Sequence, residues 1–217
     1  SGSRGTGESV ARYYSERAAS LRPALPKELR HLAWLDMDSA DGQEYWAAMQ
    51  LMGRYASASH ELIHGHVIAA IGAQALTHVE NHHNFAWEET HDGGRVIVHR
   101  KGATPAHAGQ LGVVPGSMTA PGFVVRGKGS EASLCSCSHG AGRAMSRAAA
   151  FRQLRREDWE AILRDNGVEL LSGSLDESPQ AYKDIHAVMA AQRDLVDILA
   201  EFRPRLVKMA PDEPRRS

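Results

Sequence analysis

The chain has 217 residues, of which 42% are hydrophobic and 24% are charged. These ordinary globular proportions exclude a largely disordered chain. Lys and Arg number 25 against 26 Asp and Glu, so the net charge of −1 gives no overall basic excess of the kind that marks nucleic-acid or anionic-membrane binders. The length predicts one large domain rather than two small ones.

The two cysteines, Cys135 and Cys137, lie too close together to brace a fold, which excludes a disulfide-stapled secreted domain. We find no apolar run long enough for a membrane span and no charged-then-apolar leader. A cytoplasmic protein without a membrane partner is therefore expected. The chain opens on Ser1 without Met, from which we expect a piece of a longer protein.

Apolar residues at helical spacing predict a first helix with Thr6 as its N-cap and its end near Leu21. A second, longer helix is predicted from Asp41 to about Ile71. Short β-type runs separated by glycine follow between about 81 and 143. The predicted strands there are 95–99, 112–114, 123–125 and 133–136.

The helical period returns at Ser146 and predicts a segment to about Arg164. Ser178 and Pro179 form a good N-cap and N1 pair for a last helix, whose apolar stripe runs from 185 to 202. A closing strand is predicted at 205–209, followed by a polar tail at 210–217. The pattern as a whole predicts an α+β fold in which helices flank a strand-rich core.

His60, Glu61 and His64 match the HExxH pattern, in which two imidazoles one helical turn apart bind zinc and the Glu activates water. Chance alone gives about one such match in twenty chains of this composition. The sequence after His64 lacks the third imidazole of one zinc-peptidase class, and only Glu80 offers a third ligand of another. A solvated helix face is the competing interpretation.

Three further stretches carry side chains that suit phosphate or metal chemistry. His82 and His83 stand beside amides and carboxylates, where at most one imidazole reaches a given metal because neighbours on an extended segment face opposite ways. The 99–104 turn is basic, and the 112–118 strand runs into a Pro-Gly turn. In the 135–143 loop, glycines free backbone N–H groups for a phosphate and His139 offers a nitrogen nucleophile.

Taken together and in order, the motifs SGSRG, HNFAW, HRKGAT, GVVPGSM, FVVRGKG, CSCSHGAGR with the following MSR, and AYKDIHAVMAAQ resemble the RtcB family of tRNA-splicing RNA ligases. The resemblance runs from Ser1 to about Met209, and it implies an RtcB-like catalytic core that is incomplete in this chain. It implies a GTP- and Mn²⁺-dependent enzyme that joins RNA 3′-phosphate or 2′,3′-cyclic phosphate ends to 5′-hydroxyl ends.

The resemblance also implies residue roles. His139 would attack the α-phosphate of GTP and carry GMP, and His83 would bind both Mn²⁺ and GMP. Arg4 and Arg143 would handle RNA phosphate. The GTP-binding set that the family motifs imply is His83, Asn84, Pro115, Gly116, Ser117, Met118, His139, Gly140, Ala141, Gly142 and Lys208.

The chain departs from the family pattern in three ways. The family's other metal-ligand motifs precede SGSRG, so His83 is the one recognisable metal ligand, and we expect this polypeptide alone to be inactive and to expose apolar surface. Gly122 stands where a Ser usually follows the PGSM turn. The terminal Lys that contacts guanine is matched by Lys208 within one residue, whereas an ungapped alignment gives Met209.

The expected partners are RNA, GTP, and an activating protein or a separate portion that supplies the missing ligands. Two other classes stay open. A zinc metallopeptidase would use His60, Glu61 and His64, whereas a non-catalytic RNA-binding remnant would bind RNA with a salt-dependent affinity and form no adduct at His139.

Overall fold

The computed structural model describes residues 3–210, with side chains from residue 5 onward. The predicted polar tail therefore lies outside the described residues, apart from residue 210. The chain divides into two compact units, Ser1–His78 and Val79–Ser217. In the part that the structure describes, no helix combines the length and the apolar character that crossing a membrane requires.

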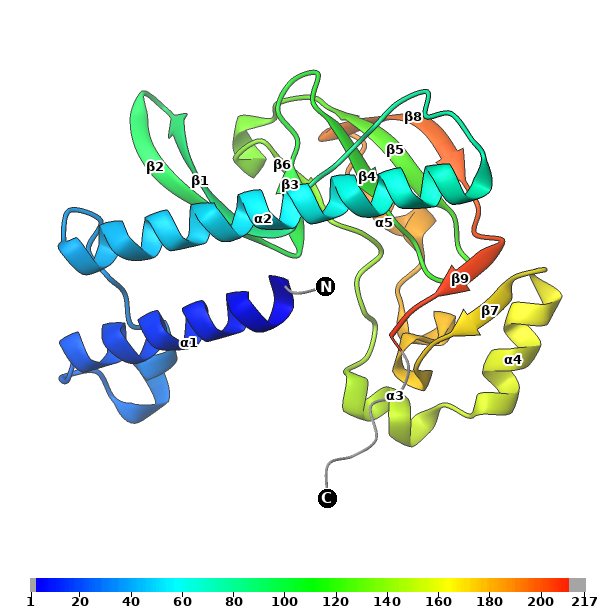
Figure 1. Ribbon diagram of the computed structural model, residues 1–217, viewed down its shortest axis with the longest axis horizontal. Coiled ribbons are helices and arrows are strands. Elements are labelled where there is room, and N and C mark those ends of the chain that lie inside the picture. The colour runs from blue at the N-terminus through cyan, green and yellow to red at the C-terminus, as the bar shows by residue number, and fades with distance from the viewer. Residues whose placement is uncertain (1–2, 211–217) are drawn as a thin grey trace. The chain divides into compact units, whose positions relative to one another are not determined.

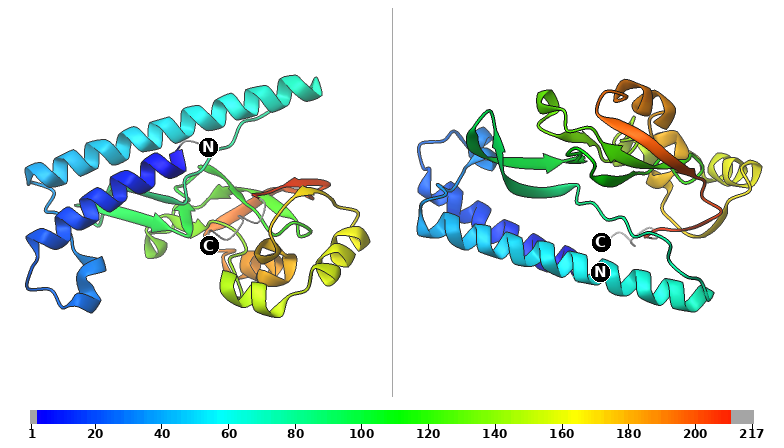
Figure 2. Two further views of the ribbon diagram at one scale, coloured as in Figure 1. Left: turned by 60° about the horizontal axis from the view of Figure 1, so that its bottom comes forward. Right: turned by 90° about the horizontal axis from the view of Figure 1, so that it is seen from above.

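The first unit is helical. It consists of α1 (Ser3–Leu21), a 3₁₀ turn (Lys27–Leu32) and α2 (Ala40–Ile71). The two helices lie side by side in the views of Figures 1 and 2, and Nε of Arg17 on α1 donates a 2.8 Å hydrogen bond to Asp41 on α2. Ser39 caps α2, because its Oγ accepts a hydrogen bond from the Gly42 N–H at 3.0 Å.

The second unit carries all of the strands in the described chain. The strands are β1 (Asn84–His91), β2 (Gly94–Lys101), β3 (Ala103–Pro105), β4 (Leu111–Val114), β5 (Gly122–Gly127), β6 (Ser136–Ser138), β7 (Glu169–Ser172), β8 (Val196–Phe202) and β9 (Leu206–Lys208). The helices are α3 (Arg147–Gln153), α4 (Arg156–Asp165) and α5 (Ile185–Ala191), with 3₁₀ turns η2 (Glu131–Ser133), η3 (Leu175–Glu177) and η4 (Pro179–Ala181). The α+β fold is confirmed.

The strands form small sheets rather than one continuous sheet. Strands β1 and β2 form an antiparallel hairpin, β3 pairs with β6, and β5 lies between β4 and β8. Strands β7 and β9 are parallel. Since β6 ends one residue before His139, its pairing with β3 fixes where that histidine lies.

Two groups of buried side chains hold the second unit together. The larger one joins the β4–β5–β8 sheet to α5, whose Ile185 and Met189 pack against Val114, Phe123 and Val125. The smaller one gathers around Trp159 of α4, which is fully buried. These two groups support the loops that lie between them.

Several sequence predictions are confirmed and several are wrong. The ends of α1 and α2 match Leu21 and Ile71. The predicted strands 95–99, 112–114 and 123–125 lie within the longer β2, β4 and β5, and β9 lies within the predicted 205–209. Thr6 is not an N-cap, because α1 begins at Ser3; the helix-breaking tendency of Gly and Ser is only a weak prior. The predicted strand 133–136 is instead a 3₁₀ turn followed by left-handed residues before β6.

The C-terminal helix predictions fail in a consistent way. The segment from Ser146 breaks at Leu154 and Arg155 into α3 and α4. The last helix is only α5, and its predicted continuation is strand β8, which hydrogen-bonds along β5. Pairing with an available strand overrides the helical spacing of the apolar residues.

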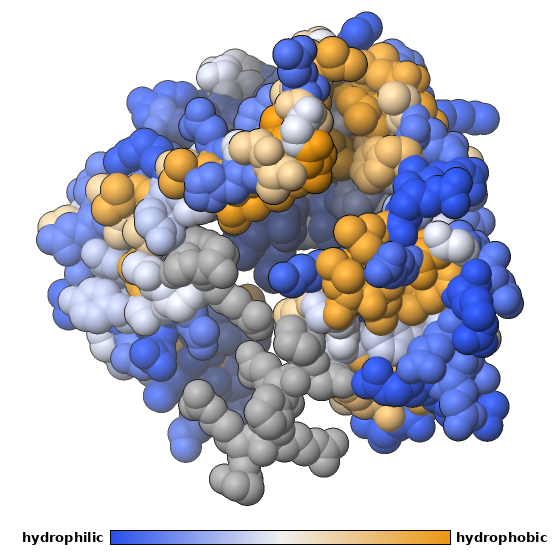
Figure 3. Space-filling view, turned by 45° about the vertical axis from the view of Figure 1, so that its right-hand side comes forward, coloured by the Kyte–Doolittle hydropathy of each residue, from blue (hydrophilic) through white to orange (hydrophobic). Residues whose placement is uncertain are grey.

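Strand β8 consequently leaves apolar side chains at the surface. Ile198, Leu199 and Phe202 are 52%, 44% and 45% exposed, although the sequence analysis assigned them to a buried helix stripe. The space-filling view shows apolar patches of this kind (Figure 3). Exposed apolar patches of a few hundred Å² commonly mark interaction surfaces.

Gly127, at the end of β5, lies against the backbone of the segment after β3. A Cβ at this position would lie 2.4 Å from the carbonyl carbon and oxygen of Ala106. We expect Gly127→Ala to lower the free energy of unfolding by about 1–3 kcal/mol because the backbones must separate. Urea denaturation measures this loss, with Gly94→Ala as the matched control, since its Cβ would meet nothing closer than 3.6 Å. Equal denaturation midpoints for the two variants would contradict the packing.

Candidate active site around His139

The nucleophile predicted from the sequence has a defined tautomer in the structure. His139 follows β6 directly, and its Nδ1 lies 2.8 Å from the carbonyl oxygen of Gly102. Because a carbonyl oxygen only accepts hydrogen bonds, Nδ1 must carry the proton. In the neutral ring, the lone pair is then on Nε2, which is the form that a nitrogen nucleophile requires.

Gly102 also connects His139 to His83. Its N–H donates to the His83 carbonyl oxygen at 3.0 Å, and its carbonyl oxygen accepts from the His139 N–H at 3.4 Å. The two imidazole rings stack with centroids 5.4 Å apart and an angle of 22° between planes. Gly102 has a φ of +72°, a conformation that favours glycine.

The stacking affects the charge of His83. Partial burial, and then the facing His139 ring, lower the pKa of His83 below its usual value. A neutral imidazole is the form that ligates a metal or accepts a hydrogen bond. The structure therefore brings together the two histidines to which the sequence analysis gave different roles.

A pocket of about 270 Å³ opens beside His139. It is lined by Pro115, His139, Gly140, Ala141, Gly142, Arg143, Arg147, Glu177 and Tyr182. The loop packs tightly on Pro115: the Ala141 N–H donates to the Pro115 carbonyl oxygen at 2.9 Å, and a Cβ on Gly140 would lie 2.9 Å from that same oxygen. A glycine is thus required where the loop meets the PGSM turn.

Arg143 supplies positive charge to this pocket. Its Nη2 donates to the Asp176 carbonyl oxygen at 2.6 Å and its Nε donates to the Met145 carbonyl oxygen at 3.1 Å. The guanidinium carbon lies 5.3 Å from the centre of the Tyr182 ring. Nη1 is buried and makes no hydrogen bond among the described residues, with the Glu177 carboxylate 3.7 Å away. An anion that reached Nη1 would satisfy this group.

Sequence reasoning missed three lining residues, which are Arg147, Glu177 and Tyr182. Arg147 forms ion pairs with Asp176 and with Glu177, the latter at 2.7 Å. The Tyr182 hydroxyl donates to Glu177, and burial, together with that carboxylate, raises the pKa of Tyr182 to about 12. Arg147 and Tyr182 lie in the quoted motifs MSR and AYKDI, so a signal was present without an assigned role, whereas Glu177 lies in none of the quoted motifs.

Four of the other residues in the predicted GTP-binding set do not line this pocket. Asn84 begins β1 beside His83, and Ser117 accepts a hydrogen bond from the Ala120 N–H at 3.2 Å. Gly116 packs so closely on the 120–121 turn that a Cβ would lie 2.3 Å from the Pro121 carbonyl oxygen. Met118 is buried in the cluster around Trp159, so its side chain does not line the pocket.

Lys208 is not among the residues that line the pocket. Lys208 is exposed on β9, where it pairs with Ser172. Met209 instead packs against the Trp159 cluster, so Lys208 is the exposed one of the two alternatives. Arg4 lies in α1, and its side chain is outside the described part.

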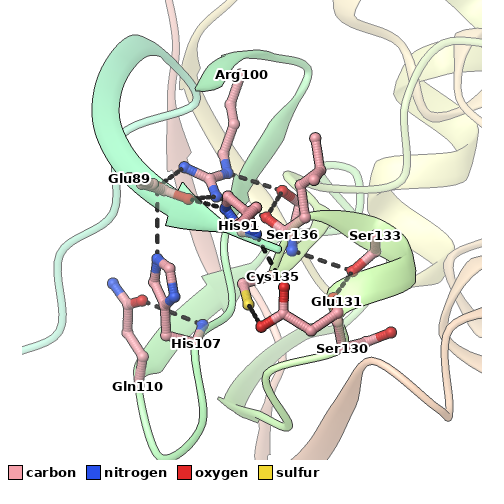
Figure 4. Close-up of polar contacts among 11 residues, drawn as sticks. Glu89, His91, Arg100, His107, Gln110, Ser130, Glu131, Ser133, Cys135 and Ser136 are labelled. Carbon is pink, nitrogen blue, oxygen red and sulfur yellow. Dashed lines mark hydrogen bonds and ion pairs between the residues drawn. The ribbon is translucent and has the colours of Figure 1, made fainter. Parts of the chain in front are cut away.

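The β1–β2 hairpin that follows His83 is anchored by a buried ion pair (Figure 4). Arg100, 2% exposed, donates to both carboxylate oxygens of Glu89 at 2.6 and 3.0 Å. It also donates to Ser136 Oγ and to the Leu134 carbonyl oxygen, both at 2.8 Å. Burial raises the pKa of Glu89, but the hydrogen bonds from Arg100 and His91 outweigh it and hold the pKa at about 2. The hairpin is thereby fixed to the segment that leads to His139.

The HExxH residues do not form a metal-binding cluster among the described residues. His60, Glu61 and His64 lie on exposed turns of α2, and Nδ1 of His64 is 3.0 Å from Nε2 of His78. Among the described residues, the only set of three potential ligand atoms within 4.8 Å of one another lies elsewhere, at His91, Glu131 and Cys135. The geometry gives no support to a peptidase.

Comparison with known proteins identifies the family. The family model described as tRNA-splicing ligase RtcB matches residues 1–209. The RNA-splicing ligase RtcB of Escherichia coli K12 is 38% identical over 94% of this chain and 53% of its own length. The tRNA-splicing ligase RtcB of Nanoarchaeum equitans is 34% identical over 94% of this chain and 50% of its own length.

An α+β unit with a histidine-bearing loop beside a cationic pocket is the kind of site that handles a phosphorylated substrate. The chain belongs to the RtcB family of RNA ligases. It spans about half the length of these two relatives.

The hydrogen bond from Nδ1 of His139 to Gly102 predicts an unusual tautomer. We expect the neutral His139 ring to be protonated at Nδ1, because that nitrogen faces a carbonyl oxygen. Two-bond ¹H–¹⁵N correlation spectra distinguish the two tautomers directly. His99, exposed on β2, serves as the reference ring, and a His139 ring protonated at Nε2 would contradict the geometry.

Proposed function

We propose that the protein containing this chain joins RNA 3′-phosphate or 2′,3′-cyclic phosphate ends to 5′-hydroxyl ends through a guanylylated His139. The observation that carries the proposal is the Nδ1–H···O=C hydrogen bond to Gly102, which leaves the Nε2 lone pair for attack. The family membership supplies the reaction class.

The first step uses GTP as a substrate. Nε2 of His139 forms a bond to the α-phosphorus, the bond from that phosphorus to the bridging oxygen breaks, and pyrophosphate leaves. The guanylyl group then passes to the RNA 3′-phosphate, where the 5′-hydroxyl displaces GMP. A P–N bond stores the nucleotide reversibly, because the imidazole is a good leaving group when it is protonated.

The pocket suits the phosphate-bearing part of the substrate. Arg143 and Arg147 supply guanidinium groups, and loop glycines let the backbone approach a phosphate closely. Tyr182 offers an aromatic face, although Arg143 already lies over it. The proposed GTP contacts also include Asn84, Ser117 and Lys208, which lie outside the lining of this pocket.

The metal requirement is only partly met by this chain. Mn²⁺ would neutralise charge on the phosphates during transfer, and His83 is the side chain proposed to ligate it. The described residues place no set of three ligand atoms around His83. The residues described here do not by themselves fit a Mn²⁺ centre, and we expect the 217-residue chain alone to be inactive.

Guanylylation at His139 tests the proposal. The full-length protein, incubated with α-labelled GTP and Mn²⁺, is expected to form an acid-labile, alkali-stable adduct, as a phosphoramidate does, and to seal RNA ends. His139→Gln removes both activities, whereas His82→Gln, the neighbour of His83, serves as the matched control and keeps the adduct. The proposal is wrong if His139→Gln still forms the adduct, or if sealing proceeds without one. A peptidase activity that is lost in Glu61→Gln would favour the HExxH alternative.

Arg147 provides a separate prediction, because it is exposed at the pocket and carries one of its positive charges. We expect Arg147→Ala in the full-length protein to reduce guanylylation about 10- to 100-fold, which corresponds to a lost charge-assisted hydrogen bond of about 1.5–3 kcal/mol. Arg152→Ala, on the same helix α3, controls for loss of surface charge. Equal rates for the two variants would rule out a phosphate contact by Arg147.

A further inference from the structure

A second cluster of metal-binding side chain types lies apart from the His139 pocket. His91 at the end of β1, Glu131 in the η2 turn and Cys135 before β6 each offer one ligand atom, and these atoms all lie within 4.8 Å of one another. Figure 4 shows the imidazole and the thiol directed toward the Glu131 carboxylate. None of the three is among the residues to which the ligase reaction assigns a role.

The separations are close to those of a metal centre. Nδ1 of His91 is 2.9 Å from Oε2 of Glu131, and Sγ of Cys135 is 3.7 Å from Oε1 of the same carboxylate. Ligand atoms around a tetrahedral zinc ion are about 3.3–3.8 Å apart, given bonds of about 2.0–2.3 Å. Side-chain movements of about 1 Å would therefore bring the three ligand atoms to the separations that one zinc ion requires.

The surroundings of His91 also match a metal site. Its second nitrogen, Nε2, lies 2.8 Å from the Glu89 carboxylate, which Arg100 holds with two hydrogen bonds. In metal centres, a ligating histidine nearly always donates its other ring N–H to a carboxylate or carbonyl group that orients the ring. This arrangement is already in place.

The cluster is both shielded and accessible. His91 and Cys135 are 8% and 5% exposed, whereas the Glu131 side chain is 68% exposed. The buried ligands exclude most competing water, and the exposed carboxylate leaves an entry path.

We propose that His91, Glu131 and Cys135 bind one Zn²⁺ ion. A thiolate together with an imidazole selects a borderline-soft ion such as Zn²⁺ over Mn²⁺, Mg²⁺ or Ca²⁺, which prefer oxygen ligands. On binding, the Cys135 thiol and Nδ1 of His91 each release a proton to solvent, while Nε2–H of His91 continues to donate to Glu89. No atom changes its oxidation state.

The ion would have a mechanical role. It would join the β1–β2 hairpin, which begins one residue after His83, to the segment from which β6 runs into His139. This fixes the spacing of the two histidines without any contact with substrate. The competing interpretation is that a doubly hydrogen-bonded imidazolium alone joins Glu89 to Glu131, with no metal.

Cobalt titration separates these interpretations and needs neither GTP nor RNA, so its result is independent of the ligase proposal. The 217-residue chain, stripped with chelator and kept reduced, is titrated with Co²⁺, whose thiolate charge-transfer band appears only when a cysteine is a ligand. We expect the band to saturate at one equivalent and to disappear on addition of Zn²⁺ but not of Mn²⁺.

The variants assign the ligands. Cys135→Ser and His91→Gln are expected to abolish the band, whereas Cys137→Ser and His99→Gln, the matched cysteine and hairpin histidine, keep it. Glu131→Gln, at an exposed position that folding tolerates, should weaken Co²⁺ binding at least tenfold, and it decides the matter if the buried variants unfold. Absence of a band, a band that survives Cys135→Ser in folded protein, or full affinity in Glu131→Gln would each overturn the site.

Discussion

The site depends on the backbone of one residue, Gly102. Its N–H binds the His83 carbonyl oxygen, while its carbonyl oxygen binds both the backbone N–H and the ring Nδ1 of His139. This single residue fixes the spacing of the two histidines and also the tautomer of His139. The left-handed conformation of Gly102 makes the arrangement possible, since other residues adopt it only with strain.

Gly102 follows a hairpin that a buried ion pair holds in place. Glu89 and Arg100 lie on neighbouring strands of the hairpin, and Arg100 extends to Ser136 and Leu134, close to the start of β6. Burying such an ion pair costs desolvation free energy. When every donor has a partner, the pair fixes the geometry of the segments that it joins. The hairpin and the nucleophile strand are thereby held in one arrangement, which a metal ion at His91 would reinforce.

In the pocket beside His139, the positive charges are already paired with carboxylates. Arg143 and Arg147 face Asp176 and Glu177, so the guanidinium groups are partly neutralised before any substrate arrives. Arg143 retains one buried nitrogen without a hydrogen bond among the described residues. An anion that bound these guanidinium groups would displace carboxylates, which favours a ligand that carries several charges.

The sequence by itself determined the family and the order of most elements, because long motifs such as CSCSHGAGR and the spacing of apolar residues in α1 and α2 are local properties. It did not reveal that 196–202 is a strand, since β5 supplies the hydrogen-bonding partner from a distant part of the chain. Nor did it indicate the stacking of His83 on His139, the pocket walls formed by Arg147 and Tyr182, or the meeting of His91, Glu131 and Cys135. These depend on contacts between residues that are distant in the sequence, such as Gly122 and Phe202, which only tertiary packing brings together.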